Sequence, residues 1–277
     1  MPSLDWYDCP IVLPYYGGKY EMSKKLIPLL PPHERYIEVF AGGLSMFFRK
    51  SKAKWNVLND KDKNIVNLYM SVILKRKELI DNLFWIPKSR DLFLNFKGEI
   101  RDENHTFEIP DPLQAAKYLY CIRYSFNKLI HTPFSMNKDM NKDWETELRY
   151  SRAHIGGTTI ENLDFAELVA KYPPAKGDFW YLDPPYFIAT DKGDYYMNNF
   201  SSEDHLRFKE AVDTIDKGGA NFMISYDHRD EVTELYSNYD IHTINLKYSG
   251  TTKEAKLIQR KEYLILNYQP ESQVEIF

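Results

Sequence analysis

Short apolar runs alternate with stretches of helical spacing toward both ends of the 277-residue chain. The apolar runs predict strands over residues 36–40, 55–58, 178–182, 221–225, 241–246 and 262–267. The helical spacing predicts helices over residues 44–49, 64–74 and 203–215. Strands that alternate with helices in this way are typical of an α/β sheet.

The middle of the chain lacks this alternation. Residues 97–110 are polar and predict a loop, and residues 127–144 are basic and loop-like. Between them, Asp111 and Pro112 predict the N-cap and first turn of a helix that runs to about Tyr124. We therefore expect residues 1–74 and 158–277 to form one α/β domain, with residues 75–157 as an insertion.

Composition excludes several classes of protein. The 40 acidic and 36 basic side chains give a net charge of −4, which excludes a polybasic, histone-like protein but still allows a local basic patch. Two cysteines, Cys9 and Cys121, are too few for a disulfide framework or a Cys-rich zinc site. No apolar run approaches the length of a membrane span, and Asp5 and Asp8 do not fit a signal peptide. We expect a soluble protein of the cytoplasm, in a bacterial or phage-infected cell.

A glycine pair follows the first predicted strand, in the segment FAGGLS at residues 40–45. Glycines allow a tight turn and a close approach of the backbone to a ligand. Asp60 ends the next predicted strand, where a doubly wound fold places an acid on a ribose diol. A plain strand-to-helix turn followed by an exposed helix cap is the alternative. No Gly-Lys-Ser/Thr follows, which disfavours a P-loop.

A second motif, Asp183-Pro184-Pro185-Tyr186, follows the predicted strand at residues 178–182. Consecutive prolines stiffen the chain and remove two N–H donors, while their carbonyls remain acceptors. A carboxylate and free carbonyls beside a flat ring suit a planar group that bears NH₂ donors, such as an amino-substituted nucleobase. The alternative is a rigid turn with Tyr186 in the core.

A third motif, Gly17-Gly18-Lys19, precedes a Lys-rich helical segment and either binds an anion or simply leads into the helix. In this order the three motifs resemble those of Dam-type, D12-class N6-adenine-specific DNA methyltransferases of the alpha arrangement. Segments 162–165, 218–226 and 261–268 resemble further motifs of that family. One departure is Leu44, which follows Gly42 and Gly43 where many members have Gly-x-Gly.

The resemblance implies a Rossmann-like S-adenosylmethionine-dependent methyltransferase sheet with a mostly helical target-recognition insertion. It implies S-adenosylmethionine as the methyl donor, without a metal; the histidines also lack metal-ligand spacing. The donor-binding positions would be Tyr15, Lys19, Phe40, Gly42, Asp60, Asp164 and Phe165. The catalytic positions would be Asp183, Pro184, Pro185 and Tyr186.

The expected chemistry follows from the exocyclic nitrogen of adenine, which is a poor nucleophile because its lone pair is delocalised into the ring. Asp183 and the Pro184 carbonyl would accept its two N–H bonds and stabilise the developing positive charge. An adenine inside a duplex must first be flipped out, and Tyr186 would stack on it.

A DNA-contacting segment is expected in the insertion. Residues 121–142 hold four Lys and Arg side chains against Asp139, a local charge of +3. The resemblance implies a hairpin that enters the DNA, although a solvated face and a core Phe126 are the alternatives. Its candidate DNA contacts are Arg123, Phe126, Asn127, Lys128, Pro133, Phe134 and Lys138. The hairpin is short and lacks an evident Arg of the GATC-specific members, so the recognition sequence stays open.

Two other functions remain open at this stage. An N4-cytosine methyltransferase uses the same pocket, although Ser is commoner there than Asp183. A non-catalytic DNA-binding protein on the same fold would have no need of both Asp60 and Asp183. A C5-cytosine enzyme is excluded because the chain has no Pro-Cys pair. The expected partner is double-stranded DNA, and no membrane is expected. Any cognate restriction endonuclease would be a separate protein. The sequence does not decide whether the enzyme has such a partner or is an orphan methylase, nor what its oligomeric state is.

Overall fold

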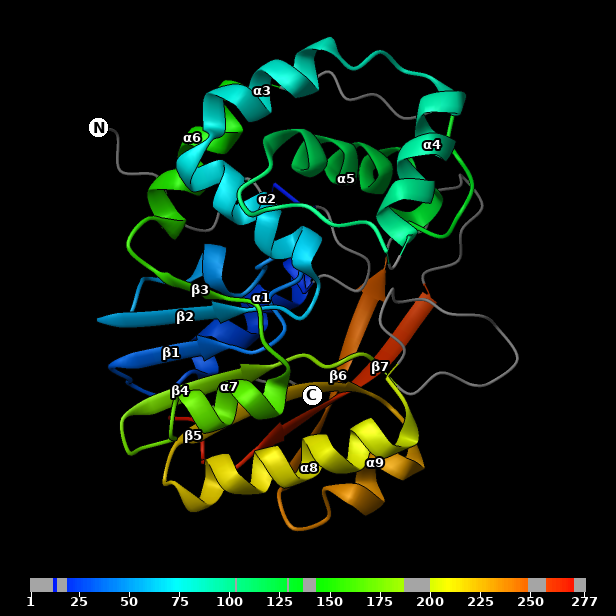
Figure 1. Cartoon of the computed structure of the whole chain (residues 1–277). Coiled ribbons are helices and arrows are strands. Elements are labelled where there is room, and N and C mark those ends of the chain that lie inside the picture. The colour runs from blue at the N-terminus through cyan, green and yellow to red at the C-terminus, as the bar shows by residue number, and fades with distance from the viewer. Residues whose placement is uncertain are drawn as a thin grey trace.

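The computed structural model describes residues 12–13, 19–102, 104–128, 130–136, 143–186, 200–248 and 258–271. These residues form a 7-stranded sheet with the order β3-β2-β1-β4-β5-β7-β6 (Figure 1). Its strands are β1 Arg35–Glu38, β2 Trp55–Asn59, β3 Thr159–Glu161, β4 Asp178–Leu182, β5 Asn221–Asp227, β6 Asp240–Tyr248 and β7 Ile258–Leu266. The predicted α/β sheet is confirmed, and the sequence analysis missed only the 3-residue β3, which is too short to show a period.

Strands β1 to β5 pair in parallel, whereas β7 runs antiparallel to both β5 and β6. Glu38 at the end of β1 pairs with Leu58 of β2 and with Tyr181 of β4. The carboxyl ends of these three strands therefore lie level with one another. In an open α/β sheet, this edge at the reversal of strand order is where ligands bind.

Helices cover both faces of the sheet (Figure 1). On one face lie α7 Phe165–Lys171, α8 Ser202–Lys217 and α9 Asp230–Leu235. On the other lie α1 Tyr20–Leu26, η2 Ile27–Leu29 and α2 Lys63–Leu74. Neighbouring residues of β4 serve opposite cores: Phe179 packs with the α1 and α2 side, and Trp180 packs with the α7 to α9 side. This explains why the strands read as nearly continuous apolar runs.

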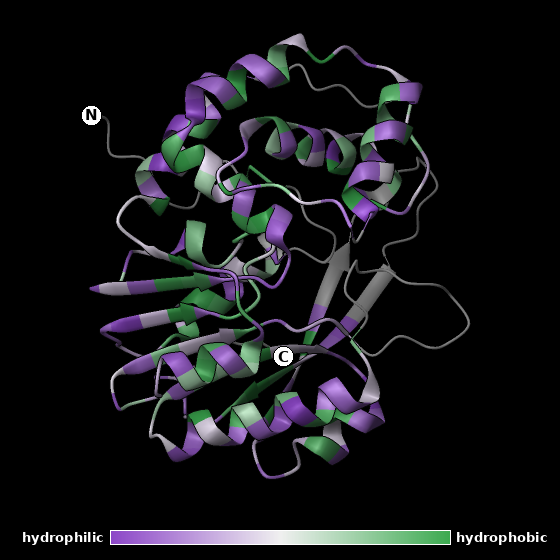
Figure 2. Cartoon of the chain, viewed as in Figure 1, coloured by the Kyte–Doolittle hydropathy of each residue, from purple (hydrophilic) through white to green (hydrophobic). Residues whose placement is uncertain are grey.

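Residues 75–157, the expected insertion, are helical throughout most of their described part. Beyond α2 they contain α3 Arg76–Trp85, α4 Arg90–Arg101, α5 Pro112–Tyr124, η4 Phe126–Lys128 and α6 Trp144–Ile155 (Figure 1). Asp111 caps α5, as predicted, and accepts hydrogen bonds from the N–H groups of Leu113 and Gln114 at 2.9 Å. Figure 2 shows hydrophobic and hydrophilic residues on each of these helices, as expected where one face is buried.

Three sequence predictions about local structure need correction. The loop predicted at residues 97–110 begins only after Arg101, because Ser89 caps α4 and its side chains Phe93 and Ile100 are buried. The helix predicted at residues 44–49 is only a 3₁₀ turn, η3 Phe47–Arg49. Trp144, predicted in a loop, begins α6. Within the described residues, no helix is both long enough and apolar enough to cross a membrane.

Candidate active site

Asp183 lies directly after β4, at the sheet edge where the strand order reverses. Its Oδ1 accepts a hydrogen bond from Ser225 Oγ at 2.9 Å and lies 3.1 Å from Lys19 Nζ. Ser225 belongs to the neighbouring strand β5, and Lys19 immediately precedes α1. The side chain of Asp183 is 21% exposed, whereas that of Lys19 is only 4% exposed.

Lys19 also contacts Glu262 of β7 and Tyr186. Its Nζ lies 3.4 Å from Glu262 Oε2, donates a hydrogen bond to the Tyr186 hydroxyl and lies 4.6 Å from the centre of the Tyr186 ring. The Tyr186 hydroxyl in turn donates to Glu262 Oε2 at 2.9 Å. We call Lys19, Asp183, Tyr186 and Glu262 the pocket cluster.

Burial raises the pKa of Asp183, and the negative charge of Glu262 raises it further. Lys19 opposes both effects, because its positive charge and its hydrogen bond favour the carboxylate. The Ser225 hydroxyl also lowers the pKa of Asp183 by donating a hydrogen bond. A carboxylate offers about four acceptor positions, so Asp183 retains capacity for the N–H of a ligand. Pro184 beside it is buried and has no N–H to compete.

The glycine turn after β1 is closed by Asp60. The Gly42 N–H donates to Asp60 Oδ2 at 2.8 Å, and the Asp62 N–H donates to Asp60 Oδ1 at 2.9 Å. Gly42 has φ 43°, a left-handed conformation that suits glycine, and its carbonyl accepts from the Tyr69 hydroxyl at 2.7 Å. Burial and the charge of Asp62 raise the pKa of Asp60 to about 7, although the N–H of Gly42 lowers it.

Leu44 keeps the geometry of the turn although it is not a glycine. It has φ 51°, and its side chain is fully buried. Its N–H donates to the carbonyl of Ala41 at 2.7 Å, and its carbonyl accepts from the Phe48 N–H at 3.0 Å. A left-handed leucine costs roughly 1–2 kcal/mol, which burial of the side chain offsets.

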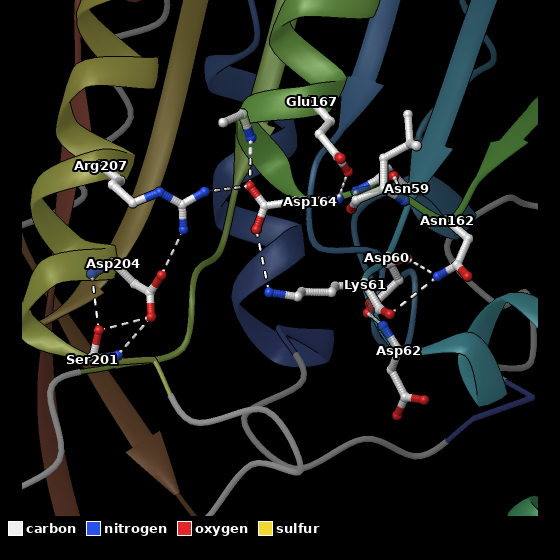
Figure 3. Close-up of polar contacts among 12 residues, drawn as sticks. Asn59, Asp60, Lys61, Asp62, Asn162, Asp164, Glu167, Ser201, Asp204 and Arg207 are labelled. Carbon is white, nitrogen blue, oxygen red and sulfur yellow. Dashed lines mark hydrogen bonds and ion pairs between the residues drawn. The ribbon is translucent and has the colours of Figure 1, made fainter. Parts of the chain in front are cut away.

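Two asparagines hold the ends of β1, β2 and β3 together (Figure 3). Asn59 Nδ2 donates to the carbonyls of Val39 and Leu163 at 2.9 and 3.0 Å, and its Oδ1 accepts from the Leu163 N–H at 3.0 Å. Asn162 Nδ2 donates to the Asp60 carbonyl at 2.8 Å. Neither asparagine was among the predicted site residues, although a polar Asn59 at the end of an apolar strand was an available signal.

Asp164 is the N-cap of α7 and the centre of an ion-pair network (Figure 3). Its Oδ1 accepts from the Ala166 N–H at 3.0 Å and from Arg207 Nη2 at 2.9 Å. Its Oδ2 lies 3.3 Å from Lys61 Nζ, and its own N–H donates to Glu167 at 3.0 Å. These contacts fix the carboxylate close to the aromatic residues described next.

Phe40, at the end of β1, and Phe165, at the start of α7, meet in one aromatic cluster. Their ring centroids are 6.2 Å apart, and Phe200 lies 6.3 and 5.8 Å from them. Phe208 of α8 completes the group at 5.5 Å from Phe40. Phe165 is buried, whereas Phe40 and Phe200 are half-buried and keep part of their surface exposed.

The segment resembling a DNA-entering hairpin does form a short hairpin. An antiparallel bridge joins Ser125 to Phe134, and the Phe126 N–H donates to the Pro133 carbonyl at 3.0 Å. Phe126 is 59% exposed, which excludes the alternative that it is a core contact. Lys128 is exposed at the other end of η4, with φ 61°.

Arg123 and Phe134 make their contacts with other groups of the protein. Arg123 is 10% exposed, donates to the Val12 carbonyl at 2.9 Å and lies 3.6 Å from Glu147. Burial lowers the pKa of Arg123 to about 10. Phe134 is half-buried, with its ring 5.3 Å from that of Phe93. These positions favour a structural role for both side chains.

Tyr15 and Lys138 lie outside the described residues, and so does the side chain of Asn127.

Fold and site together define a class. The sheet has the order β3-β2-β1-β4-β5-β7-β6 with one antiparallel strand, and a glycine turn follows β1 and an acid follows β2. These features are those of a Rossmann-like methyltransferase. The chain belongs to the family of D12 class N6 adenine-specific DNA methyltransferases, whose profile matches residues 15–249. It is therefore an enzyme that methylates adenine N6 in DNA.

Similar proteins bear related names. The type II methyltransferase M1.LlaDCHI of Lactococcus lactis subsp. cremoris is 24% identical, over 91% of this chain and 93% of that protein. A DNA adenine methylase of Salmonella typhi is also 24% identical, over 93% of this chain and 95% of its own length. Among solved structures, an rRNA methylase from Streptococcus thermophilus has a TM-score of 0.40 at 9% identity and covers 91% of this chain and 96% of its own.

Proposed function

We propose that this chain transfers the methyl group of S-adenosylmethionine to N6 of an adenine that has been flipped out of double-stranded DNA, with Asp183 as the residue that binds the amino group. One observation supports this most directly. Asp183 is fixed at the end of β4 by Lys19 and Ser225, at 3.1 and 2.9 Å from its Oδ1. Preorganised acceptors of this kind stabilise charge that develops during a reaction.

The described donor-binding positions fit S-adenosylmethionine. The half-buried Phe40 offers ring surface for the adenine of the donor, the buried Phe165 packs against Phe40, and Asp164 beside Phe165 can accept from the donor's amino group. The Asp60 carboxylate accepts from the backbone N–H groups of Gly42 and Asp62, one on each oxygen, and retains acceptor capacity for a ribose hydroxyl. Gly42 has no side chain that would keep the donor away from the backbone of the turn. When bound, S-adenosylmethionine supplies an electrophilic methyl group.

The pocket residues act on the target adenine. Asp183 and the Pro184 carbonyl accept the two N–H bonds of N6, which favours the pyramidal nitrogen and stabilises its positive charge. The Pro185 ring keeps this segment stiff, and Tyr186 presents its ring to the flipped base. After transfer N6 is strongly acidic, so its proton leaves without a strong base.

On the DNA side, we propose that the hairpin enters the duplex beside the target base. The exposed Phe126 fills the space that the base leaves, with Asn127, Pro133 and Lys138 as further contacts. The exposed Lys128 binds a phosphate. Arg123 and Phe134 support the hairpin from within.

The cellular setting follows from this activity. The named type II relative favours a restriction–modification role, in which a separate endonuclease would be the partner. The enzyme would then act in the cytoplasm of a bacterial or phage-infected cell, where its DNA substrate is found.

The test is to incubate the purified protein with methylase-free plasmid DNA and methyl-labelled S-adenosylmethionine, and to separate the nucleosides by mass spectrometry. We expect labelled N6-methyladenine from the wild type, and a loss of at least about 100-fold with Asp183→Ala. Labelled N4-methylcytosine, or label that persists in Asp183→Ala, would contradict the proposal. Sequencing of the methylated DNA then gives the recognition sequence.

A further inference from the structure

Glu262 is a second carboxylate in the pocket cluster, and the sequence analysis did not single it out. It lies on β7, in a strand whose next four residues, Tyr263 to Leu266, are all buried and apolar or aromatic. Its side chain is 8% exposed, and its Oε2 lies 3.4 Å from Lys19 Nζ. The register places it opposite Asp227 of β5, two positions beyond Ser225.

The arrangement puts one buried cation between two carboxylates. Lys19 Nζ is 3.1 Å from Asp183 Oδ1 on one side and 3.4 Å from Glu262 Oε2 on the other. One carboxylate would be enough to neutralise Lys19, and burying a second negative charge is costly. With all three groups ionised, the trio bears one net negative charge. Because the second carboxylate, that of Glu262, is buried at this cost beside the proposed reacting centre, we infer that it has a role in the reaction.

Glu262 also fixes the tyrosine of the motif. The Tyr186 hydroxyl donates to Glu262 Oε2 at 2.9 Å. One face of the Tyr186 ring stacks on Tyr226, with centroids 5.9 Å apart and planes at 26°. Tyr226 is itself hydrogen-bonded to the buried His205 of α8. Glu262 therefore holds the hydroxyl end of a ring whose orientation Tyr226 also restricts.

We propose that Glu262 is a positioning residue for methyl transfer, which orients Lys19 and Tyr186 and gives the pocket its net negative charge. The inference rests on the proposed function. During the reaction the C–S bond breaks as the C–N bond forms, and positive charge moves from sulfur to N6 before N6 loses a proton to solvent. A net negative pocket next to N6 favours that movement of charge.

A pH profile separates this role from simple packing. Asp183 faces Lys19, Glu38 of β1, Tyr181 of β4 and Glu262. The charge of Glu262 raises the pKa of Asp183, so replacing Glu262 by Gln should lower that pKa. Because the carboxylate is the active form, the acidic limb of kcat should then move to lower pH. The other charged neighbours are unchanged in the variant.

The experiment compares the wild type, Glu262→Gln and Glu262→Asp, with Glu231→Gln as the control, since Glu231 is an exposed glutamate on α9. For Glu262→Gln we expect a kcat about 10- to 100-fold lower, a KM for the donor within about 3-fold, and the acidic limb at lower pH. Glu262→Asp keeps the charge, so its acidic limb should stay near that of the wild type while kcat falls partly. Glu231→Gln should match the wild type throughout.

Two results would overturn the inference: a kcat of Glu262→Gln within 2-fold of the wild type, or a reduced kcat with an unmoved acidic limb. A ¹³C titration of the Asp183 carboxyl in the ligand-free protein gives a second readout, in which Glu262→Gln must show the lower pKa. If Glu262→Gln does not fold, the Glu262→Asp profile decides, because an acidic limb shifted well away from the wild type contradicts the charge role. An inactive wild type would refute the proposed function instead, while the titration would still test Glu262.

Discussion

The catalytic pocket and the hairpin differ in where their side chains find partners. In the pocket, Lys19 is 4% exposed and Glu262 is 8% exposed, and both are engaged by groups of the protein itself. In the hairpin, Phe126 is 59% exposed. Groups that stabilise a transition state act best when they are fixed in advance. Groups that contact DNA must keep surface available until the DNA arrives. The exposure of the side chains therefore distinguishes the pocket, where they are buried, from the hairpin, where Phe126 is exposed.

After Asp183→Ala, the largest effect is expected in the pocket at Tyr186. Tyr186→Ala removes the ring that we propose stacks on the flipped base, and it should reduce methyl transfer by about 100-fold. Tyr186→Phe keeps the ring but loses the hydroxyl bond to Glu262, so its loss should stay within about 10-fold. Single-turnover rates on duplex DNA measure both. Equal losses in the two variants would show that the hydroxyl, not the ring, matters.

The second prediction compares two phenylalanines of the hairpin. Phe134→Ala should lower the free energy of unfolding by about 2 kcal/mol, because the ring packs on Phe93 and Tyr124. Phe126→Ala should change it by less than about 0.5 kcal/mol and instead weaken DNA binding by about 10-fold. Denaturant unfolding and a DNA-binding titration provide the two measurements. A destabilised Phe126→Ala protein would remove the contrast between the two residues.

The third prediction concerns the glycine turn after β1, which we propose binds the donor. Leu44→Gly relieves the left-handed backbone strain, but it also empties a fully buried position. Loss of a buried leucine outweighs the relief, so we expect a net loss of about 2 kcal/mol in the free energy of unfolding. Thermal or denaturant unfolding measures it. A variant with a higher free energy of unfolding would mean that the backbone strain at Leu44 costs more than the burial of its side chain contributes.

The smallest effect is expected at Lys128. Lys128→Ala should weaken DNA binding only a few-fold and reduce the salt slope by about 0.9, as for the loss of one phosphate contact. Arg123→Ala should leave the slope unchanged and lower the free energy of unfolding by about 2 kcal/mol, because its contacts to Val12 and Glu147 are internal. Binding titrations between low and moderate salt distinguish the two. A flatter salt dependence of DNA binding for Arg123→Ala would show that Arg123 contacts DNA after all.

Much of the fold and part of the site could be predicted from the chain alone. The apolar runs located six of the seven strands of the described sheet, because buried parallel strands leave a continuous apolar signal. Asp111 and Pro112 marked the start of α5 because capping is local. The amphipathic helices α3, α4 and α6 were missed or taken for loops, since their polar faces weaken the apolar signal.

The sequence by itself determined the order of the motifs, and with it the family, because glycine turns, proline pairs and caps act on neighbouring residues. Only the tertiary structure decided that Glu262 and Ser225 join Lys19 and Asp183, since they come from different segments and meet through strand pairing. It also decided that Arg123 is internal while Phe126 is exposed, although the two residues are only three positions apart. Burial is a property of packing between distant segments, and no local pattern records it.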